Sequence, residues 1–204
     1  MEFQQLFADQ FKAVAEKKYG SSTTRSSKLL EPIHSKIAEL VEKEGFSTRS
    51  LCNSEYEFIG AYGSKKVDIA IFNGDKFVGA INFKGIRSEY NKNANNYYEN
   101  MKGESSLFID NNIPVYQIIF IPTTVRHKNN NGEKTFETPS ENSYKHYCNF
   151  VSNHSSYWNK LKLGVFYFDV DYDYDYEIFY SSQVVPGVED TLTEGLINFM
   201  KEVK

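Results

Sequence analysis

An aspartate and a lysine stand close together along the chain, each in a short apolar segment. Asp68 lies within Val67–Phe72, and Lys84 directly follows Phe77–Phe83. A carboxylate in such a position can bind a divalent cation, which activates water and neutralises charge on a phosphate. A neighbouring lysine can orient or help to deprotonate the water, or stabilise the charged transition state. The two residue types therefore indicate metal-dependent hydrolysis of a phosphate ester.

A tight turn is expected to bring these residues together. Asn73-Gly74-Asp75 separates the two apolar segments and is typical of a β-hairpin. Asn82 precedes Lys84 by two positions, so both share one face of the returning strand. Separately, each has an ordinary explanation, Asp68 as an acid at a strand end and Lys84 as a lysine extending from a buried strand. Their joint order on strand, turn and strand favours catalysis.

This arrangement resembles the PD-(D/E)XK nuclease superfamily, and within it the type II restriction endonucleases. The resemblance rests on Val-Asp68-Ile-Ala-Ile-Phe, the hairpin turn and Ile-Asn82-Phe-Lys84. It continues through residues 92–104, which look like the asparagine-rich helix that follows the lysine strand in some of these enzymes. It is strong over residues 56–122 and looser over 25–45, where Arg25, Lys28 and the helix through Glu31 resemble the family's N-terminal helix. The resemblance implies an α/β protein with a restriction-endonuclease-like central mixed β-sheet flanked by helices.

One position departs from the family pattern. The acid that normally precedes the lysine by two residues is Asn82 here, and an amide oxygen brings no charge to a cation. We expect Glu99, on the following helix, to supply the missing carboxylate, with Glu104 and Glu31 as possible extra acids. The resemblance then implies Mg²⁺, with Mn²⁺ as a substitute, bound by Asp68, Glu99 and Asn82. Alternatively, the catalytic site is impaired.

The segment after Lys84 carries groups suited to nucleic acid. Amides hydrogen-bond to base edges and to phosphates, and cations attract the phosphate backbone. The resemblance implies duplex DNA as substrate, cut at a short specific sequence by a homodimer that matches a two-fold symmetric site. The candidate DNA-binding residues are Arg87, Ser88, Tyr90, Lys92, Asn93 and Asn96.

Three regions of the chain are expected to hold this site within a single nuclease domain spanning residues 1–204. Residues 1–50 have helical periodicity, with a second helix over about 28–44 that ends at Gly45. Residues 56–122 form the catalytic core, with a helix over 91–110 and a buried strand over 115–121.

The aromatic-rich remainder, 123–204, begins with a polar segment, 126–143, predicted as a mobile loop. Alternating aromatic and acidic residues over 165–180 predict a long strand or bent ribbon, and 192–203 an amphipathic helix.

The overall charge, taken alone, argues against a nucleic-acid partner. The 204 residues carry 23 Lys and Arg against 27 Asp and Glu, a net charge of −4. However, acids gather over residues 169–177 and at 189–190, whereas the N-terminal third is basic, so the total describes an asymmetric molecule. No apolar run approaches membrane-spanning length, and the N-terminus has no signal-peptide pattern. We therefore expect a cytoplasmic protein with no membrane partner, and the resemblance to restriction endonucleases implies a bacterial or archaeal one.

Three other functions fit the same sequence. The first is a non-catalytic DNA-binding member of the same fold, in which Asn82 marks an inactive site. The second is a structure-selective or repair nuclease without sequence preference. The third is a protein-interaction module that assembles through the aromatic segment 166–180.

Overall fold

The computed structural model describes residues 30–50, 54–85, 90–122, 125–137, 160–173, 178–184 and 188–204. The first helix expected within residues 1–50 lies outside these ranges, as do Arg25 and Lys28. So do Arg87 and Ser88.

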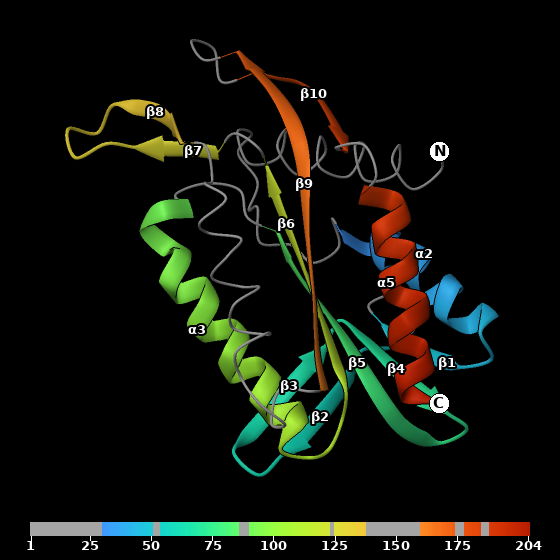
Figure 1. Ribbon diagram of the computed structural model, residues 1–204. Helices are drawn as coiled ribbons and strands as arrows, with labels where there is room; N and C mark the ends of the chain where they lie inside the picture. Colours follow the sequence, from blue (N-terminus) through green and yellow to red (C-terminus); the bar gives the residue numbers. More distant parts are fainter. Residues whose placement is uncertain are drawn as a thin grey trace.

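The described chain is an α/β structure built on a six-stranded mixed sheet in the order β1-β4-β5-β6-β9-β10 (Figure 1). β1, β4 and β5 are antiparallel neighbours, β6 runs parallel to both β5 and β9, and β10 returns antiparallel to β9. Their bounds are β1 Ser47–Ser50, β4 Ile69–Asn73, β5 Lys76–Gly85, β6 Val115–Pro122, β9 Leu161–Asp173 and β10 Ile178–Val184. Two separate two-stranded ribbons are β2 Tyr56–Gly60 with β3 Gly63–Val67, and β7 Val125–Lys128 with β8 Lys134–Glu137.

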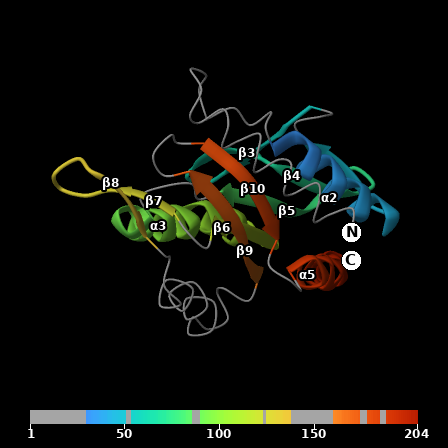
Figure 2. The same ribbon diagram turned by 90° about the horizontal axis from the view of Figure 1, so that it is seen from above.

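Helices cover both faces of the sheet (Figures 1 and 2). α2 (Glu31–Lys43) and α5 (Val188–Val203) pack on one face, and α3 (Tyr90–Ile109) packs on the other. α2 packs along its length on the sheet because Ile33, Ile37 and Val41 recur every fourth residue on one side of the helix and are buried. It ends at Lys43, and Gly45 closes the turn that follows, with a φ of +91° that suits a residue without a side chain.

Most elements predicted for the core are confirmed. The turn at Asn73-Gly74-Asp75 joins β4 to β5, with Gly74 at a φ of +61°. The helix over 91–110 is α3, the strand over 115–121 is β6, and the C-terminal helix is α5. Of the described helices, none is long and apolar enough to cross a membrane.

Three details differ from the predictions. The segment Val67–Phe72 is not one strand, because the chain bends at Asp68 between β3 and β4. The predicted loop over 126–143 begins instead as the β7–β8 ribbon, since its asparagines and Gly132 form a tight turn between two short strands. Residues 138–143 lie outside the described part. Of the alternating segment 165–180, residues 165–173 lie in β9 and 178–180 in β10, so the described part forms two antiparallel strands, as a bent ribbon would, and not one long strand.

Candidate functional site

Asp68 occupies the bend between β3 and β4, where it interrupts the ladder of backbone hydrogen bonds. Its carboxylate Oδ2 accepts a hydrogen bond of 2.7 Å from the backbone N–H of Phe83 in β5. Ile69 pairs with Ile81, so the same antiparallel register continued by one residue sets Asp68 opposite Asn82. The hairpin therefore brings the predicted aspartate to the strand segment between Asn82 and Lys84.

Burial dominates the electrostatics of Asp68. Loss of solvent raises the pKa of its carboxyl group from 3.8 to about 6. The hydrogen bond from Phe83 and the charge of Lys65 lower this pKa, whereas the charges of Glu104 and Glu55 raise it. The negative charge of Asp68 is thus only partly compensated within the protein. A bound cation would stabilise this charge.

Lys84 and Asn82 lie on the α3 face of the sheet. Ile81 and Phe83 pack toward α2 and α5, so the residues between and after them project to the opposite side. The Nζ atom of Lys84 lies 5.5 Å from the centroid of the Tyr97 ring, which belongs to α3. Lys84 is exposed, which leaves its ammonium group accessible to a ligand.

Asn82 differs from its neighbour in being buried. Its side chain is 1% exposed, and neither atom of its amide group has a hydrogen-bond partner within the described part of the chain. A buried amide without partners costs about 1–3 kcal/mol relative to a satisfied one. The amide oxygen is therefore available to a ligand that approaches Asp68.

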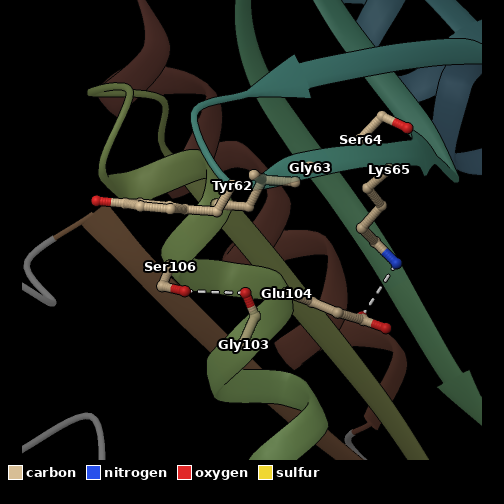
Figure 3. Close-up of a pocket in the computed structure, with 8 residues that line it drawn as sticks. Tyr62, Gly63, Ser64, Lys65, Gly103, Glu104 and Ser106 are labelled. Atoms are coloured by element: carbon tan, nitrogen blue, oxygen red, sulfur yellow. Dashed lines mark hydrogen bonds and ion pairs between the residues drawn. The ribbon is translucent and has the colours of Figure 1, made fainter.

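Glu104 is the acid that α3 presents to this region. Its carboxylate lies 3.1 Å from the Nζ atom of Lys65 in β3, an ion pair visible in Figure 3. The pair lines a groove of about 410 Å³ between the β2–β3 ribbon and α3, with Tyr62 and Ser106 also on its walls. Glu104 also lines a smaller pocket, of about 20 Å³, together with Lys84. Glu104 therefore borders both the groove that contains Lys65 and the pocket that contains Lys84.

The other two candidate acids lie elsewhere. Glu99 is exposed, and it precedes Glu104 by five residues, which sets it roughly 140° away around the helix. The structure therefore brings Glu104, and not Glu99, toward Asp68. Glu31 lies in the first turn of α2, on the opposite face of the sheet from Lys84.

The candidate DNA-binding residues of α3 have different exposures. Lys92 and Asn96 are exposed and Asn93 is half-buried, so these three offer polar groups at the surface. Tyr90 does not, because it is fully buried in the core and its ring lies 6.4 Å from that of Tyr97. The prediction that Tyr90 binds DNA is therefore wrong, because its ring packs in the core at the start of α3.

A histidine that no sequence pattern singled out lies behind the site. His34 of α2 is 1% exposed and stacks on Phe83 at 4.7 Å between ring centroids. Burial lowers its pKa to about 4, against the opposing effect of the Glu55 charge. A polar residue adjacent to Ile33 on an apolar helix face was the available signal. His34 supports the strand residue whose N–H holds Asp68.

Oxygen donors of the site suit a hard divalent cation. Asp68 supplies a carboxylate whose charge is only partly compensated, Asn82 supplies an amide oxygen that has no partner among the described residues, and Glu104 supplies a second carboxylate. Within the described ranges, no three His, Cys, Asp or Glu side chains gather closely enough to form a metal site of acidic and imidazole groups alone. The amide oxygen of Asn82 is the third oxygen donor that this group of residues offers, beside the two carboxylates.

Comparisons with protein families, with curated proteins and with solved structures found no match. Chemically, the site combines a buried carboxylate, an accessible ammonium group and a second acid. That combination suits activation of water against a negatively charged ester.

Proposed function

We propose that the protein is a Mg²⁺-dependent endodeoxyribonuclease of the PD-(D/E)XK superfamily, cutting duplex DNA at a specific sequence as type II restriction enzymes do. The observation that carries the proposal is the Asp68 carboxylate, held by the N–H of Phe83 between Asn82 and Lys84. The order of elements also supports it. A helix, three successive antiparallel strands, a second helix and a strand parallel to the third form one continuous unit, α2-β1-β4-β5-α3-β6, with the β2–β3 ribbon inserted.

Asp68, Asn82 and Glu104 are the residues that would hold the metal. When bound, the cation supplies an activated water and neutralises charge on the phosphate. Lys84 orients the attacking water and donates hydrogen bonds to the phosphate oxygens, from a position fixed by the Tyr97 ring. Water adds to phosphorus, one phosphorus–oxygen ester bond breaks, and the departing oxygen takes up a proton.

Glu104, rather than Glu99, completes the acidic set in this proposal. The Glu104 carboxylate forms an ion pair with Lys65, and the positive charge of Lys65 also lowers the pKa of Asp68. A divalent cation would compete with Lys65 for the Glu104 carboxylate. The ion pair is therefore a feature of the metal-free protein that metal binding would weaken.

Plasmid cleavage tests the proposal. Supercoiled DNA should be cut with Mg²⁺ or Mn²⁺ and left intact with EDTA, and Asp68→Asn and Lys84→Ala should each lower the rate at least a hundredfold. Glu104→Gln should lower it at least tenfold, whereas Glu99→Gln, a matched change on the exposed side of α3, should cut like the parent. Equal loss from both glutamate variants would contradict the assignment of Glu104. Digestion of unmethylated phage DNA should give discrete bands, since a smear would indicate a nuclease without sequence preference.

A second candidate is a DNA-binding protein of the same fold that does not cut. Asn82 favours it, because a buried amide stands where the family pattern has a metal-binding acid. Duplex binding that persists without any divalent cation, together with no cleavage in Mg²⁺ or Mn²⁺, would support this candidate. Asn82→Asp distinguishes the two further, because a site that lacks only this carboxylate should gain cleavage when it is restored.

A further inference from the structure

The groove between the β2–β3 ribbon and α3 has two walls that are fixed relative to each other. Phe58 of β2 stacks on Phe108 of α3, with 5.2 Å between the ring centroids. Gly60, at the end of β2, approaches α3 so closely that a methyl group in its place would collide with the Leu107 side chain. The groove is therefore preformed, and its volume of about 410 Å³ falls within the range of about 300–1,000 Å³ that is typical of small-molecule sites.

Tyr62 presents an aromatic ring on one wall of this groove. It lies in the turn between β2 and β3, is 85% exposed, and projects over the turn of α3 that carries Gly103 and Ser106 (Figure 3). A single exposed aromatic residue is common on protein surfaces, but this one lines a groove that has a glycine on each wall. At Gly63 and Gly103, no atom of the described residues lies within 4 Å of the position that a Cβ atom would take. The space beside the Tyr62 ring is therefore open to a flat ligand.

The polar groups of the groove can both donate and accept hydrogen bonds. Ser106 donates its hydroxyl to a backbone carbonyl of α3 at 2.9 Å, and Ser64 donates its hydroxyl to the Glu57 carboxylate at 2.6 Å. Each hydroxyl oxygen can still accept a hydrogen bond. The Lys65 ammonium group has three N–H donors, and its ion pair with Glu104 uses one of them. An aromatic ring with donors and acceptors around it is complementary to a nucleobase, which is flat and carries both kinds of group on its edge.

The position of the groove also favours a nucleobase over other flat ligands. Glu104 borders both the groove and the pocket that contains Lys84, so a ligand in the groove lies next to the place proposed for the phosphate. In a nucleic-acid strand each phosphate is joined through a sugar to a base, so one strand can reach both places. A base within a duplex is paired and stacked, and it can enter a groove only when it is unpaired or has left the stack.

We propose that this groove binds an unpaired nucleobase of the DNA strand held at the candidate active site, with the base stacked on the Tyr62 ring. Lys65 donates to a carbonyl oxygen or ring nitrogen of the base, and the hydroxyl oxygens of Ser64 and Ser106 accept from its N–H groups. The choice of a nucleobase rests on the proposed function, because it depends on a phosphate beside Lys84. Neither the metal nor the cleavage step is needed for the base to bind.

Fluorescence anisotropy with the full chain in EDTA tests the groove. Two labelled probes are compared, a short single strand of mixed sequence and a strand of the same length whose sugars carry no bases. The parent should bind the strand with bases more tightly, and Tyr62→Ala should weaken binding of that strand by about fivefold or more while leaving binding of the base-free strand unchanged. Tyr62→Phe keeps the aromatic face and should bind both strands like the parent.

Two further variants separate loss of the groove from loss of the fold. Gly103→Leu places a side chain in the groove, and leucine favours a helix interior over glycine, so this variant should melt no lower than the parent while losing affinity as Tyr62→Ala does. Ile59→Ala is the matched control on the ribbon, because Ile59 is 76% exposed and lies outside the set of residues that line the groove. Its affinity for the strand with bases should change less than twofold.

Several outcomes would overturn the proposal. These are equal binding of the two strands by the parent, unchanged binding by Tyr62→Ala and Gly103→Leu, and an equal loss from Ile59→Ala. A protein that binds bases through Tyr62 but never cuts plasmid would retain this inference and contradict the nuclease. Plasmid cleavage by the parent, together with full affinity of Tyr62→Ala for the strand with bases, would retain the nuclease and contradict this inference.

Discussion

At the scale of single residues, Asp68 combines catalytic suitability with a cost in stability. Burial raises its pKa from 3.8 to about 6, so the folded state disfavours the charged form that predominates at neutral pH. A group whose pKa is raised on folding stabilises the fold only below its unfolded value, and that contribution is lost as the pH rises through about 6. At pH 7 the charged carboxylate therefore opposes folding by up to about 3 kcal/mol.

Asp68→Asn should consequently stabilise the metal-free protein. The amide keeps an acceptor for the Phe83 N–H and has no charge to bury, so the free energy of unfolding at pH 7 should rise by about 1–3 kcal/mol. Urea denaturation in EDTA measures this change in the free energy of unfolding. Glu99→Gln, which removes the charge of an exposed acid, is the control. A loss of stability in Asp68→Asn at pH 7 would show that the charge is compensated in the folded state.

His34 should impose the opposite pH dependence. Its pKa falls from 6.5 to about 4 on folding, so its neutral form stabilises the fold above pH 6.5 and this contribution is lost as the pH falls toward 4. His34→Phe preserves stacking on Phe83 but does not titrate. When the pH is lowered from 7 to 5, the free energy of unfolding of the variant should therefore rise by about 2 kcal/mol relative to that of the parent. Denaturation at the two pH values checks this, and an unchanged difference would contradict it.

The sequence located Asp68 and Lys84 because strand alternation and a turn of known type place residues without knowledge of distant contacts. The sequence does not distinguish Glu104 from Glu99 as the acid of α3 that faces the sheet. The choice between Glu99 and Glu104 depends on which helix face meets the sheet, and the weakly amphipathic α3 leaves that face ambiguous until Met101, Ser105 and Phe108 are seen to be buried. His34 was missed because burial, not spacing, distinguishes it.

At the scale of elements, two helical glycines make a matched comparison. A methyl group on Gly195 of α5 would collide with the buried hydroxyl of Tyr116 in β6, whereas nothing approaches the same position at Gly103 of α3. Alanine generally stabilises a helix interior by about 1 kcal/mol relative to glycine. At Gly195 that gain is opposed by overpacking, which typically costs about 1–3 kcal/mol.

Gly103→Ala should therefore stabilise the protein by about 0.5–1 kcal/mol, and Gly195→Ala should destabilise it by about 1–2 kcal/mol. Thermal and urea denaturation measure both. Adding Tyr116→Phe to Gly195→Ala removes the colliding oxygen and should recover part of the loss. A stable Gly195→Ala would mean that α5 shifts freely over β6.

Elements that depend on long-range pairing were the least predictable. β6 was recognised because a continuous β-branched run is typical of a strand buried on both faces. The sequence predicts a loop where the β7–β8 ribbon lies, since the residues there are polar and the two strands span only four residues each. Its order comes from the cross-strand pairs and from the Asn129 hydrogen bonds, neither of which leaves an apolar pattern in the sequence.

At the scale of the whole molecule, the net charge does not describe the surroundings of the candidate site. The total of −4 includes the acidic run over 169–177, whose described part lies in β9. The candidate site lies on β5, next to β6, and its surroundings include the cations Lys65 and Lys84. An acidic protein can therefore still present a DNA-binding side, because association depends on the local field near the contact.

One site of this kind can cut one strand at a time, so cleavage of both strands at a symmetric sequence requires two copies of the chain. Co-expression of the parent with an excess of Asp68→Asn should give mixed dimers with one active site each. These should convert supercoiled plasmid mainly to nicked circles, whereas parent protein purified the same way should give linear DNA. Co-expression with Glu99→Gln, which leaves the inward acids intact, controls for dilution. The fraction of cleaved plasmid that is linear could instead be the same in the Asp68→Asn mixture as with the parent protein. That result would show that the two strands are cut by independent monomers.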